Sequence, residues 1–338
     1  MMTLSTEPAL DTGNDGSRAP RVSVIIPTYK RGDFLRLAVK SLFAQDLPPS
    51  DYEIIVVDSS PAQDGLIALR ELASNAPCRL RCFIKQAEGP GASRNMGARN
   101  ARGTFLAFMD DDCQATPQWL SQALPAFTEG VGIVQGQTLP DPKGKLGIFV
   151  HYIVIDKQSA LFETANILYR REAFEQVGGF RDKDATPDAT TPTGGEDVML
   201  GWKVKREGWQ ARFVPEALVY HAVLPITKRE WIWQKRQMLW PHLVRVVPEL
   251  RSEVMYGGYF LNSAHAGATL LLLGIIGCAL SPWSLLLAVP YFAIRASEPS
   301  KSLRGPLKLV RPLVYLGRDV AAVCGMAIAS VRARSLLL

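Results

Sequence analysis

Cysteine is scarce in this 338-residue chain, and its five cysteines form no CxxC pair. This pattern argues against a disulfide framework and a thiolate zinc site, and it favours reduced thiols in the cytosol. The first 20 residues lack an apolar segment of the kind found in signal peptides, so we expect residues 1–20 to be disordered. The sequence shows neither a fixed-period repeat nor a low-complexity tract.

An excess of one charge sign is also small. The net charge is +6 and the pI is about 9.1, which is modest for a dedicated nucleic-acid binder. No nucleic-acid recognition motif accompanies it, so we expect no nucleic-acid partner. The distribution is uneven, because residues 1–224 carry 27 acidic and 24 basic residues, whereas residues 225–338 carry 5 and 14. An acidic body with a basic tail predicts two different environments.

Charged side chains are missing from the 41 residues 254–294. A membrane-crossing helix needs about 20 apolar residues, so this stretch predicts a helical hairpin that enters or crosses a bilayer; a buried core hairpin is the alternative. The basic segment 295–318 fits a cytosolic loop, and residues 320–331 predict an interfacial helix or a third short insertion. We therefore expect membrane-associated helices over 254–338, in contact with lipids of an inner or plasma membrane. Residues 225–253 are expected to form amphipathic linker helices.

Apolar runs alternate with helical periodicity from residue 21 onward. The β-branched run Val22–Ile26 predicts a strand, and apolar residues at helical spacing predict a helix over Asp33–Gln45. Continuous apolar strands between helices indicate a parallel α/β sheet covered on both faces. In such sheets ligands collect at the carboxyl ends of the strands, and Asp58 and Asp110–Asp112 stand at such ends.

Three adjacent aspartates follow the buried run that ends at Met109. Alternation along an extended chain places Asp110 and Asp112 on one side and Asp111 on the other. Neighbouring carboxylates repel, and their pKa values rise unless a cation lies between them. A hard divalent ion, Mg²⁺ or Mn²⁺, relieves that repulsion. A solvated acidic turn is the alternative interpretation.

Two further groups of residues allow more than one interpretation. Glu196 and Asp197 open an apolar helix after two glycines, so they are either helix caps or a carboxylate general base. His221 is either an ordinary packed residue or a third ligand for Mn²⁺. The polar loop 182–195 is either a mobile lid or local disorder.

The stretch Gly89–Gly97 is rich in small residues and contains Arg94 and Asn95. Its composition predicts a close approach of the backbone to a ligand, with Arg94 able to contact a phosphate. The stretch matches neither a P-loop nor a GxGxxG fingerprint.

Seven motifs in order carry a resemblance to a known family. The chain resembles the family-2 glycosyltransferases of the GT-A fold over residues 21–221. The motifs are Val24-Ile-Ile-Pro-Thr-Tyr29, Val56-Val-Asp58-Ser59, Arg94-Asn95-Met96-Gly97, Phe108-Met-Asp-Asp-Asp112, Gly178-Gly-Phe180, Gly195-Glu-Asp197 and Pro215 to His221.

The resemblance implies a GT-A type, Rossmann-like, mostly parallel sheet flanked by helices over 21–224. It also implies inverting transfer of a sugar from a nucleoside-diphosphate sugar to a hydroxyl of a lipid-linked or saccharide acceptor, in polysaccharide or glycolipid biosynthesis at the cytosolic membrane face. Asp197 would be the general base with Glu196 beside it, and Asp110, Asp112 and His221 would hold Mn²⁺ or Mg²⁺. The residues implied to bind the nucleotide sugar are Pro27, Thr28, Tyr29, Asp58, Arg94, Asn95 and Asp111.

Two other functions remain as alternatives. A sugar-nucleotide pyrophosphorylase uses a related sheet, but it requires a glycine-rich basic loop that Pro27–Gly32 does not supply. A non-catalytic membrane protein that binds sugar nucleotides is the second alternative, and the intact acidic set argues against it.

Overall fold

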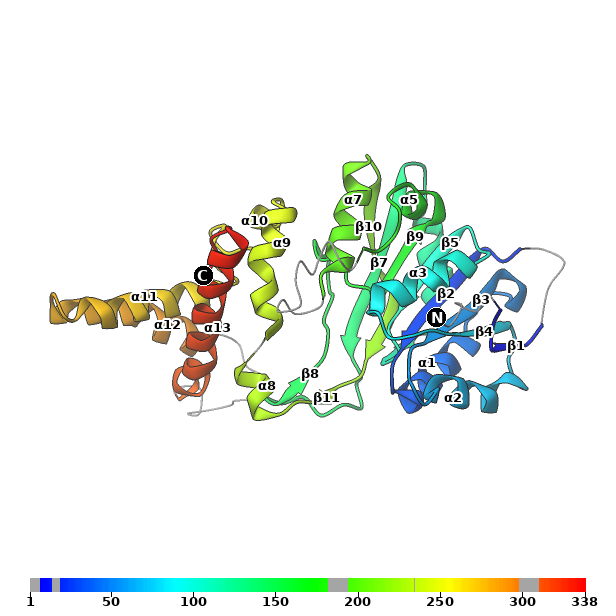
Figure 1. The fold of residues 1–338 in the computed structure, drawn as a ribbon, viewed down its shortest axis with the longest axis horizontal. Helices are drawn as coiled ribbons and strands as arrows, with labels where there is room; N and C mark the ends of the chain where they lie inside the picture. The colour runs from blue at the N-terminus through cyan, green and yellow to red at the C-terminus, as the bar shows by residue number, and fades with distance from the viewer. Residues whose placement is uncertain (1–6, 14–18, 182–193, 234, 298–309) are drawn as a thin grey trace. The chain divides into compact units, whose positions relative to one another are not determined.

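The computed structural model describes residues 7–13, 19–181, 194–233, 235–297 and 310–338. The chain divides into two compact units (Figure 1). The predicted domain 21–224 is continuous, whereas unit 2 also takes in residues 145–151. The predicted loop 182–195 lies outside the described residues except for Gly194 and Gly195. Unit 1 comprises Met1–Gly144, Tyr152–Asp184 and Glu196–Val223, and unit 2 comprises Lys145–His151, Ala185–Gly195 and Leu224–Leu338.

Unit 1 is built on a nine-stranded mixed sheet in the order β1-β4-β3-β2-β5-β9-β7-β10-β6. The neighbours β4, β3, β2 and β5 are parallel, as the sequence predicts, and so are β7 and β10. Antiparallel pairs join β9 to β5 and β7, and β6 to β10. The strands are β1 Leu10–Asp11, β2 Val22–Thr28, β3 Tyr52–Asp58, β4 Arg79–Ile84, β5 Phe105–Met109, β6 Cys113–Ala115, β7 Val131–Pro140, β9 Asn166–Arg170 and β10 Gln210–His221.

Helices cover both faces of this sheet, which is why its central strands are mostly apolar. Val24 and Ile26 of β2 belong to the core cluster beneath α1 and α2. Ile25 points the other way, toward α3, where a Cβ on Gly97 would overlap its side chain. The helices of unit 1 are α1 Gly32–Phe43, η1 Pro49–Asp51, α2 Asp64–Ala73, α3 Pro90–Asn100, α4 Trp119–Ala123, η2 Leu124–Ala126, α5 Arg171–Gln176 and α7 Glu196–Arg206.

The expected disorder of residues 1–20 is wrong for part of that segment. Leu10 and Asp11 form the short edge strand β1, which pairs with Cys82 and Arg81 of β4. An ion pair between Asp11 and Arg79, with a closest N–O distance of 2.7 Å, fixes its position. Pairing with an existing sheet edge supplies the order that this polar segment does not encode locally.

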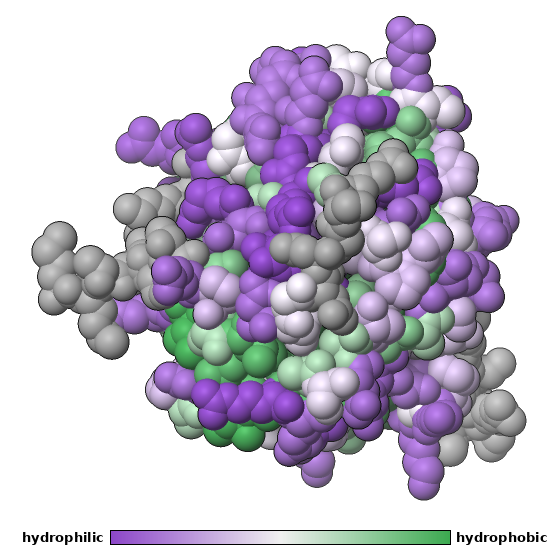
Figure 2. Space-filling view, turned by 90° about the vertical axis from the view of Figure 1, so that its right-hand side faces the viewer, coloured by the Kyte–Doolittle hydropathy of each residue, from purple (hydrophilic) through white to green (hydrophobic). Residues whose placement is uncertain are grey.

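Figure 2 shows a mainly hydrophilic face of the molecule that also carries a continuous apolar area.

Unit 2 consists mainly of helices and has its own small apolar cluster around Ala268, Leu271, Tyr291 and Val323. Asp319 lies inside this unit, where it accepts hydrogen bonds from the Arg295 guanidinium and the Tyr291 hydroxyl. The elements of unit 2 are β8 Val150–His151, β11 Leu224–Pro225, α8 Lys228–Ile232, η3 Lys235–Leu239, α9 Trp240–Val246, α10 Leu250–Glu253, α11 Ser263–Gly277, η4 Pro282–Ala288, α12 Val289–Ser297 and α13 Arg311–Ala333.

The uncharged stretch 254–294 contains α11, η4 and the first part of α12, which continues past Arg295 to Ser297. Within the described residues, the helix long and apolar enough to cross a membrane is α13, with 23 residues, whereas α11 is shorter. The sequence predicts only the apolar part of α13, residues 320–331. The observed helix begins nine residues earlier because Arg311 and Arg318 interrupt the apolar pattern without interrupting the helix.

Candidate active site

The three aspartates lie in the turn that joins β5 to β6, at the carboxyl end of β5. The backbone N–H of Cys113 donates to the carbonyl oxygen of Asp110 at 3.2 Å, which closes the turn. The predicted alternation of the side chains is therefore wrong, because the chain leaves the extended conformation after Met109. Asp111 and Asp112 face a common partner, whereas Asp110 has a different one.

Arg31 is the partner that Asp111 and Asp112 share. Its Nη1 lies 2.7 Å from Asp112 Oδ2 and 3.3 Å from Asp111 Oδ1. The hydroxyl of Thr28, at the end of β2, donates to Asp111 Oδ2 at 2.7 Å. These contacts bring the ends of the neighbouring parallel strands β2 and β5 together, at the edge where a ligand of this sheet class binds.

Burial raises the pKa of Asp111 to about 7. The Thr28 hydrogen bond acts in the opposite direction, and the neighbouring charge of Asp112 adds to the increase. Desolvated carboxylates this close to one another favour either a proton or an added cation between them. The local electrostatics therefore suit a cation.

His221 reaches the same turn through strand pairing. It is the last residue of β10 and pairs with Cys113 of β6, and the backbone N–H of Ala222 donates to the carbonyl oxygen of Asp112 at 2.9 Å. The side chain is buried, with Nδ1 2.7 Å from the carbonyl oxygen of Ala222 and Nε2 3.5 Å from Asp112 Oδ1. With Nδ1 at the carbonyl oxygen of Ala222, Nε2 is the ring nitrogen that faces Asp112.

Ligand atoms of Asp112, Cys113 and His221 all lie within 4.8 Å of one another. Burial keeps the pKa of the Cys113 thiol well above its usual value, so this sulfur stays protonated and is a weak ligand. A carboxylate and a neutral imidazole are suitable ligands for Mn²⁺, and carboxylates suit Mg²⁺. The residues present therefore fit a hard divalent cation, with Asp112 and His221 as its centre and Asp110 at the start of the same turn.

Arg94 connects this turn to the second acidic group. It lies on α3, is almost completely buried, and donates from Nη2 to Asp110 Oδ1 at 2.8 Å and from Nη1 to Glu196 Oε1 at 3.0 Å. Glu196 and Asp197 form the first turn of α7. One guanidinium thus joins the predicted metal site to the predicted base site, and the sequence separation of 102 residues between Arg94 and Glu196 is closed by the fold.

Asp197 lies beside this ion pair. Burial raises its pKa to about 8, and the charge of Glu196 adds to the increase, whereas Arg94 acts in the opposite direction. Its Oδ1 accepts the backbone N–H of Val198 at 2.8 Å. A carboxylate with a pKa near the working pH can take a proton from a hydroxyl and release it again.

Two of the predicted nucleotide-binding residues have structural bonds. Asp58 is completely buried and accepts the backbone N–H groups of Ser60 at 2.8 Å and Leu66 at 3.1 Å, which caps the start of α2. Asn95 donates to the carbonyl oxygen of Phe180 at 2.6 Å and accepts its N–H at 2.9 Å. These bonds hold secondary-structure ends together, and nucleotide contacts by both residues stay predictions.

Three more of the predicted nucleotide-binding residues stand at the end of β2 or just after it. Pro27 is half-buried, Thr28 is buried against Asp111, and the Tyr29 side chain is exposed. An exposed aromatic ring beside the acidic turn is available for stacking, and that role also remains a prediction.

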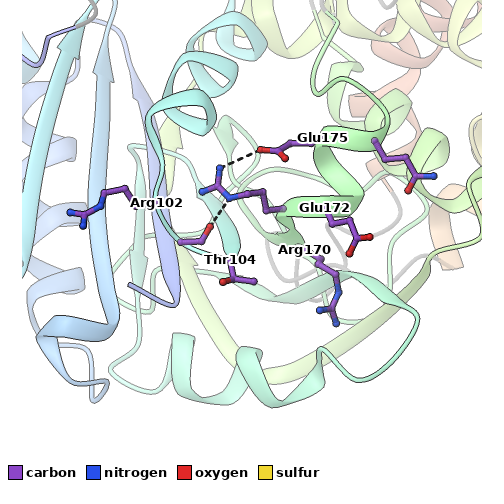
Figure 3. Close-up of a pocket in the computed structure, with 8 residues that line it drawn as sticks. Arg102, Thr104, Arg170, Glu172 and Glu175 are labelled. Atoms are coloured by element: carbon purple, nitrogen blue, oxygen red, sulfur yellow. Dashed lines mark hydrogen bonds and ion pairs between the residues drawn. The ribbon is translucent and has the colours of Figure 1, made fainter. Parts of the chain in front are cut away.

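A hollow of about 660 Å³ lies at the opposite end of β5 (Figure 3). Arg171 of α5 donates to the carbonyl oxygen of Gly103 at 2.8 Å and pairs with Glu175 at 3.4 Å. None of the predicted site residues lines this hollow. The lining residues are Arg102, Gly103, Thr104, Arg170, Arg171, Glu172, Glu175 and Gln176.

Sequence reasoning missed three residues near the acidic groups. Arg31 carries a weak signal, since it is basic and follows the first strand directly before a helix. Cys113 is adjacent to the acidic run, but nothing in its type indicates a ligand. Glu163 is a half-buried carboxylate whose charge contributes to the raised pKa of Asp197, and only the fold brings the two together.

Comparison with known proteins identifies the family. The family model described as "Glycosyl transferase family 2" matches residues 23–180, and the model "Glycosyl transferase family group 2" matches residues 105–297. The chain is 30% identical over 219 residues to glycosyltransferase AglE of Haloferax volcanii. This match covers 62% of this chain and 69% of that protein. It is 34% identical over 129 residues to the GalNAc(5)-diNAcBac-PP-undecaprenol beta-1,3-glucosyltransferase of Campylobacter jejuni. This match covers 38% of this chain and 41% of that protein.

The fold has a solved counterpart. The mannosyltransferase PcManGT from Pyrobaculum calidifontis, in complex with GDP-Man and Mn²⁺, is similar with a TM-score of 0.56 and 19% identity, and the match covers 98% of this chain and 90% of that one. This likeness establishes the fold, and the family models carry the identification. The chain belongs to the family-2 glycosyltransferases and is a glycosyltransferase enzyme.

Proposed function

We propose that the protein transfers a sugar from a nucleoside-diphosphate sugar to an acceptor hydroxyl, with inversion and with a divalent cation, at the cytosolic face of a membrane. One observation carries this proposal: Arg94 joins Asp110 of the acidic turn to Glu196, the neighbour of Asp197. Sugar transfer requires the donor-binding carboxylates and the general base to lie close together. The two ion pairs of Arg94 hold Asp110 and Glu196 close to each other. Family membership argues against the pyrophosphorylase alternative.

The cation would be held by Asp110, Asp112 and His221, and when bound it supplies positive charge to the diphosphate. The solved mannosyltransferase of similar fold binds Mn²⁺ together with GDP-Man, which supports Mn²⁺ as a first choice. Thr28 keeps Asp111 oriented at the end of β2. Tyr29 is exposed beside it and is proposed to stack on the nucleoside.

Asp197 is proposed as the general base. It accepts the proton of the acceptor hydroxyl as the acceptor oxygen bonds to the anomeric carbon, and the bond from that carbon to the diphosphate breaks. A single displacement of this kind inverts the anomeric configuration. Arg94 neutralises Glu196, which limits the repulsion that Asp197 would otherwise experience when it is ionised.

A panel of UDP, GDP and dTDP sugars, each assayed with Mn²⁺ and with Mg²⁺, tests the proposal. We expect one donor to be hydrolysed or transferred only with a divalent cation, and Asp112→Asn to reduce that rate about 10²-fold or more because a metal ligand is lost. Glu175→Gln, at the far end of the sheet, is the matched control. Equal rates in the presence of a chelator would contradict metal dependence.

The acceptor is proposed to be lipid-linked, in polysaccharide or glycolipid synthesis. The Campylobacter relative acts on an undecaprenol-linked glycan by its name, and unit 2 exposes large apolar side chains. Leu280, in the turn after α11, and Trp283, at the start of η4, are 93% and 77% exposed. Exposed apolar groups of this size are typical of a surface that enters a membrane interface.

Vesicle flotation tests the membrane proposal with the full chain. We expect the double variant Leu280→Glu and Trp283→Glu to bind phosphatidylethanolamine–phosphatidylglycerol vesicles about tenfold or more weakly, since burial of two such side chains is lost. Leu37→Glu, on the exposed face of α1 in unit 1, is the control and should bind like the wild type. Equal binding by all three proteins would refute insertion of this turn.

A further inference from the structure

Two arginines neutralise the acidic turn of unit 1, and they differ in freedom. The Arg94 side chain is 6% exposed and donates to two carboxylates, Asp110 and Glu196. The Arg31 side chain is 45% exposed and donates to Asp111 and Asp112 through a single nitrogen, Nη1. Arg94 is therefore fixed by burial, whereas most of the Arg31 fork can change partners without crossing a packed interior.

The backbone beneath Arg31 is held in place. Lys30 adopts a left-handed conformation with φ of 57°, and its N–H donates to the Ser60 hydroxyl at 2.7 Å. A Cβ on Gly32 would lie 2.8 Å from the carbonyl oxygen of Asp64, so the chain is also packed against α2 on the other side. A left-handed non-glycine residue persists where its surroundings determine it, often at a functional site. A fixed backbone with a long exposed side chain suits a group that moves between two nearby partners.

Arg31 contacts a carboxylate oxygen of Asp112, a residue proposed to bind the divalent cation. Its Nη1 is 2.7 Å from Asp112 Oδ2, and the other oxygen of the same carboxylate, Oδ1, is 3.5 Å from His221 Nε2. A divalent cation beside Asp112 would repel the guanidinium and compete for the same carboxylate. The donor brings a diphosphate to the same place, and an arginine fork binds phosphate oxygens well.

We propose that Arg31 competes with the divalent cation for Asp112 and, once displaced, binds the diphosphate of the sugar nucleotide. This inference rests on the proposed function, because it needs the cation and the diphosphate at the acidic turn. The cation alone then binds weakly, because it must displace Arg31 from Asp112. The cation binds more strongly when the diphosphate is present, because the diphosphate accepts the displaced Arg31. Cation and nucleotide would thus promote each other's binding through this side chain.

Arg31→Gln tests the proposal, with Arg36→Gln as a matched control. Arg36 lies on the outer face of α1 and pairs with Asp33 and Glu71, so its variant makes the same charge change away from the turn. Calorimetry with Mn²⁺ alone gives the first affinity. Calorimetry with UDP, and separately with GDP, at saturating Mn²⁺ gives the second. Thermal unfolding confirms that both variants are folded.

We expect Arg31→Gln to bind Mn²⁺ alone about fivefold more tightly and the nucleoside diphosphate about fivefold more weakly than Arg36→Gln, the size of one partly exposed ion pair. Unchanged Mn²⁺ affinity, or unchanged diphosphate affinity at saturating Mn²⁺, overturns the proposal. Failure of the wild-type protein to bind Mn²⁺ with either nucleotide would instead overturn the proposed metal-dependent function. Arg31→Lys should restore much of the competition with Mn²⁺ but less of the diphosphate affinity, because lysine lacks the fork.

Discussion

The two ends of the unit 1 sheet both carry arginines and carboxylates, yet only one end has the properties of an active site. At the carboxyl end of β5, the side chains of Asp111 and Asp112 are 7% and 6% exposed. At the opposite end, Glu175 is 62% exposed and pairs with Arg171 (Figure 3). Charge alone therefore does not distinguish a site from a solvated surface. Crowding of like charges away from water does, because it raises pKa values and creates a demand for a cation or proton.

Asp197→Asn should produce the largest difference in kcat between substitutions at the two ends of the sheet. Loss of a general base lowers rates about 10²–10⁴-fold, so we expect kcat for sugar transfer to fall in that range while the protein stays folded. Glu175→Gln removes a carboxylate from the other end and should leave kcat unchanged. Initial rates with the identified donor measure both effects. Comparable losses in the two variants would show that the buried end is not special.

The pH dependence of transfer should follow Asp197. Its pKa is raised to about 8, so at lower pH it is protonated and cannot accept a proton from the acceptor. We expect kcat/KM at saturating cation to rise about tenfold per pH unit below 8 and then to level off. Glu196→Gln removes a negative charge from beside Asp197 and takes away one of the two carboxylates that Arg94 contacts, so more of the Arg94 charge acts on Asp197. Both changes lower the pKa of Asp197, so the profile should shift toward lower pH. A flat profile from pH 6 to 9 would argue against Asp197 as the base.

Apolar runs predict a central strand of the sheet and the helix that follows it. The predicted strand Val22–Ile26 lies within β2, and the predicted helix Asp33–Gln45 overlaps α1, Gly32–Phe43, because one-sided burial produces a readable period. The edge strand at Leu10 has no such period, since its order comes from pairing with β4. The local apolar pattern indicates which residues are buried. It does not indicate which sheet edge a short polar segment pairs with.

The candidate site shows the same division between local and tertiary information. The position of the three aspartates at a strand end could be predicted, because the apolar run stops at Met109. Their partners could not, since the register of β10 with β6 brings His221 to Cys113, and the reach of Arg31 depends on the loop at Lys30. Motif order indicates which residues gather, but ion pairs formed through the fold decide which of them face one another.

Arg171→Ala should produce the smallest effect and sharpen the comparison from the other side. Arg171 donates to the carbonyl oxygen of Gly103 and ties α5 to the start of β5, so its loss should lower the free energy of unfolding by about 1 kcal/mol. Denaturant unfolding of the full chain measures that change, with Glu172→Gln as a control at the same hollow. Sugar-transfer kinetics should not change, because this guanidinium contacts no residue of the acidic turn. A lowered kcat with normal stability would mean that the hollow takes part in catalysis, and the distinction between the two ends would then be lost.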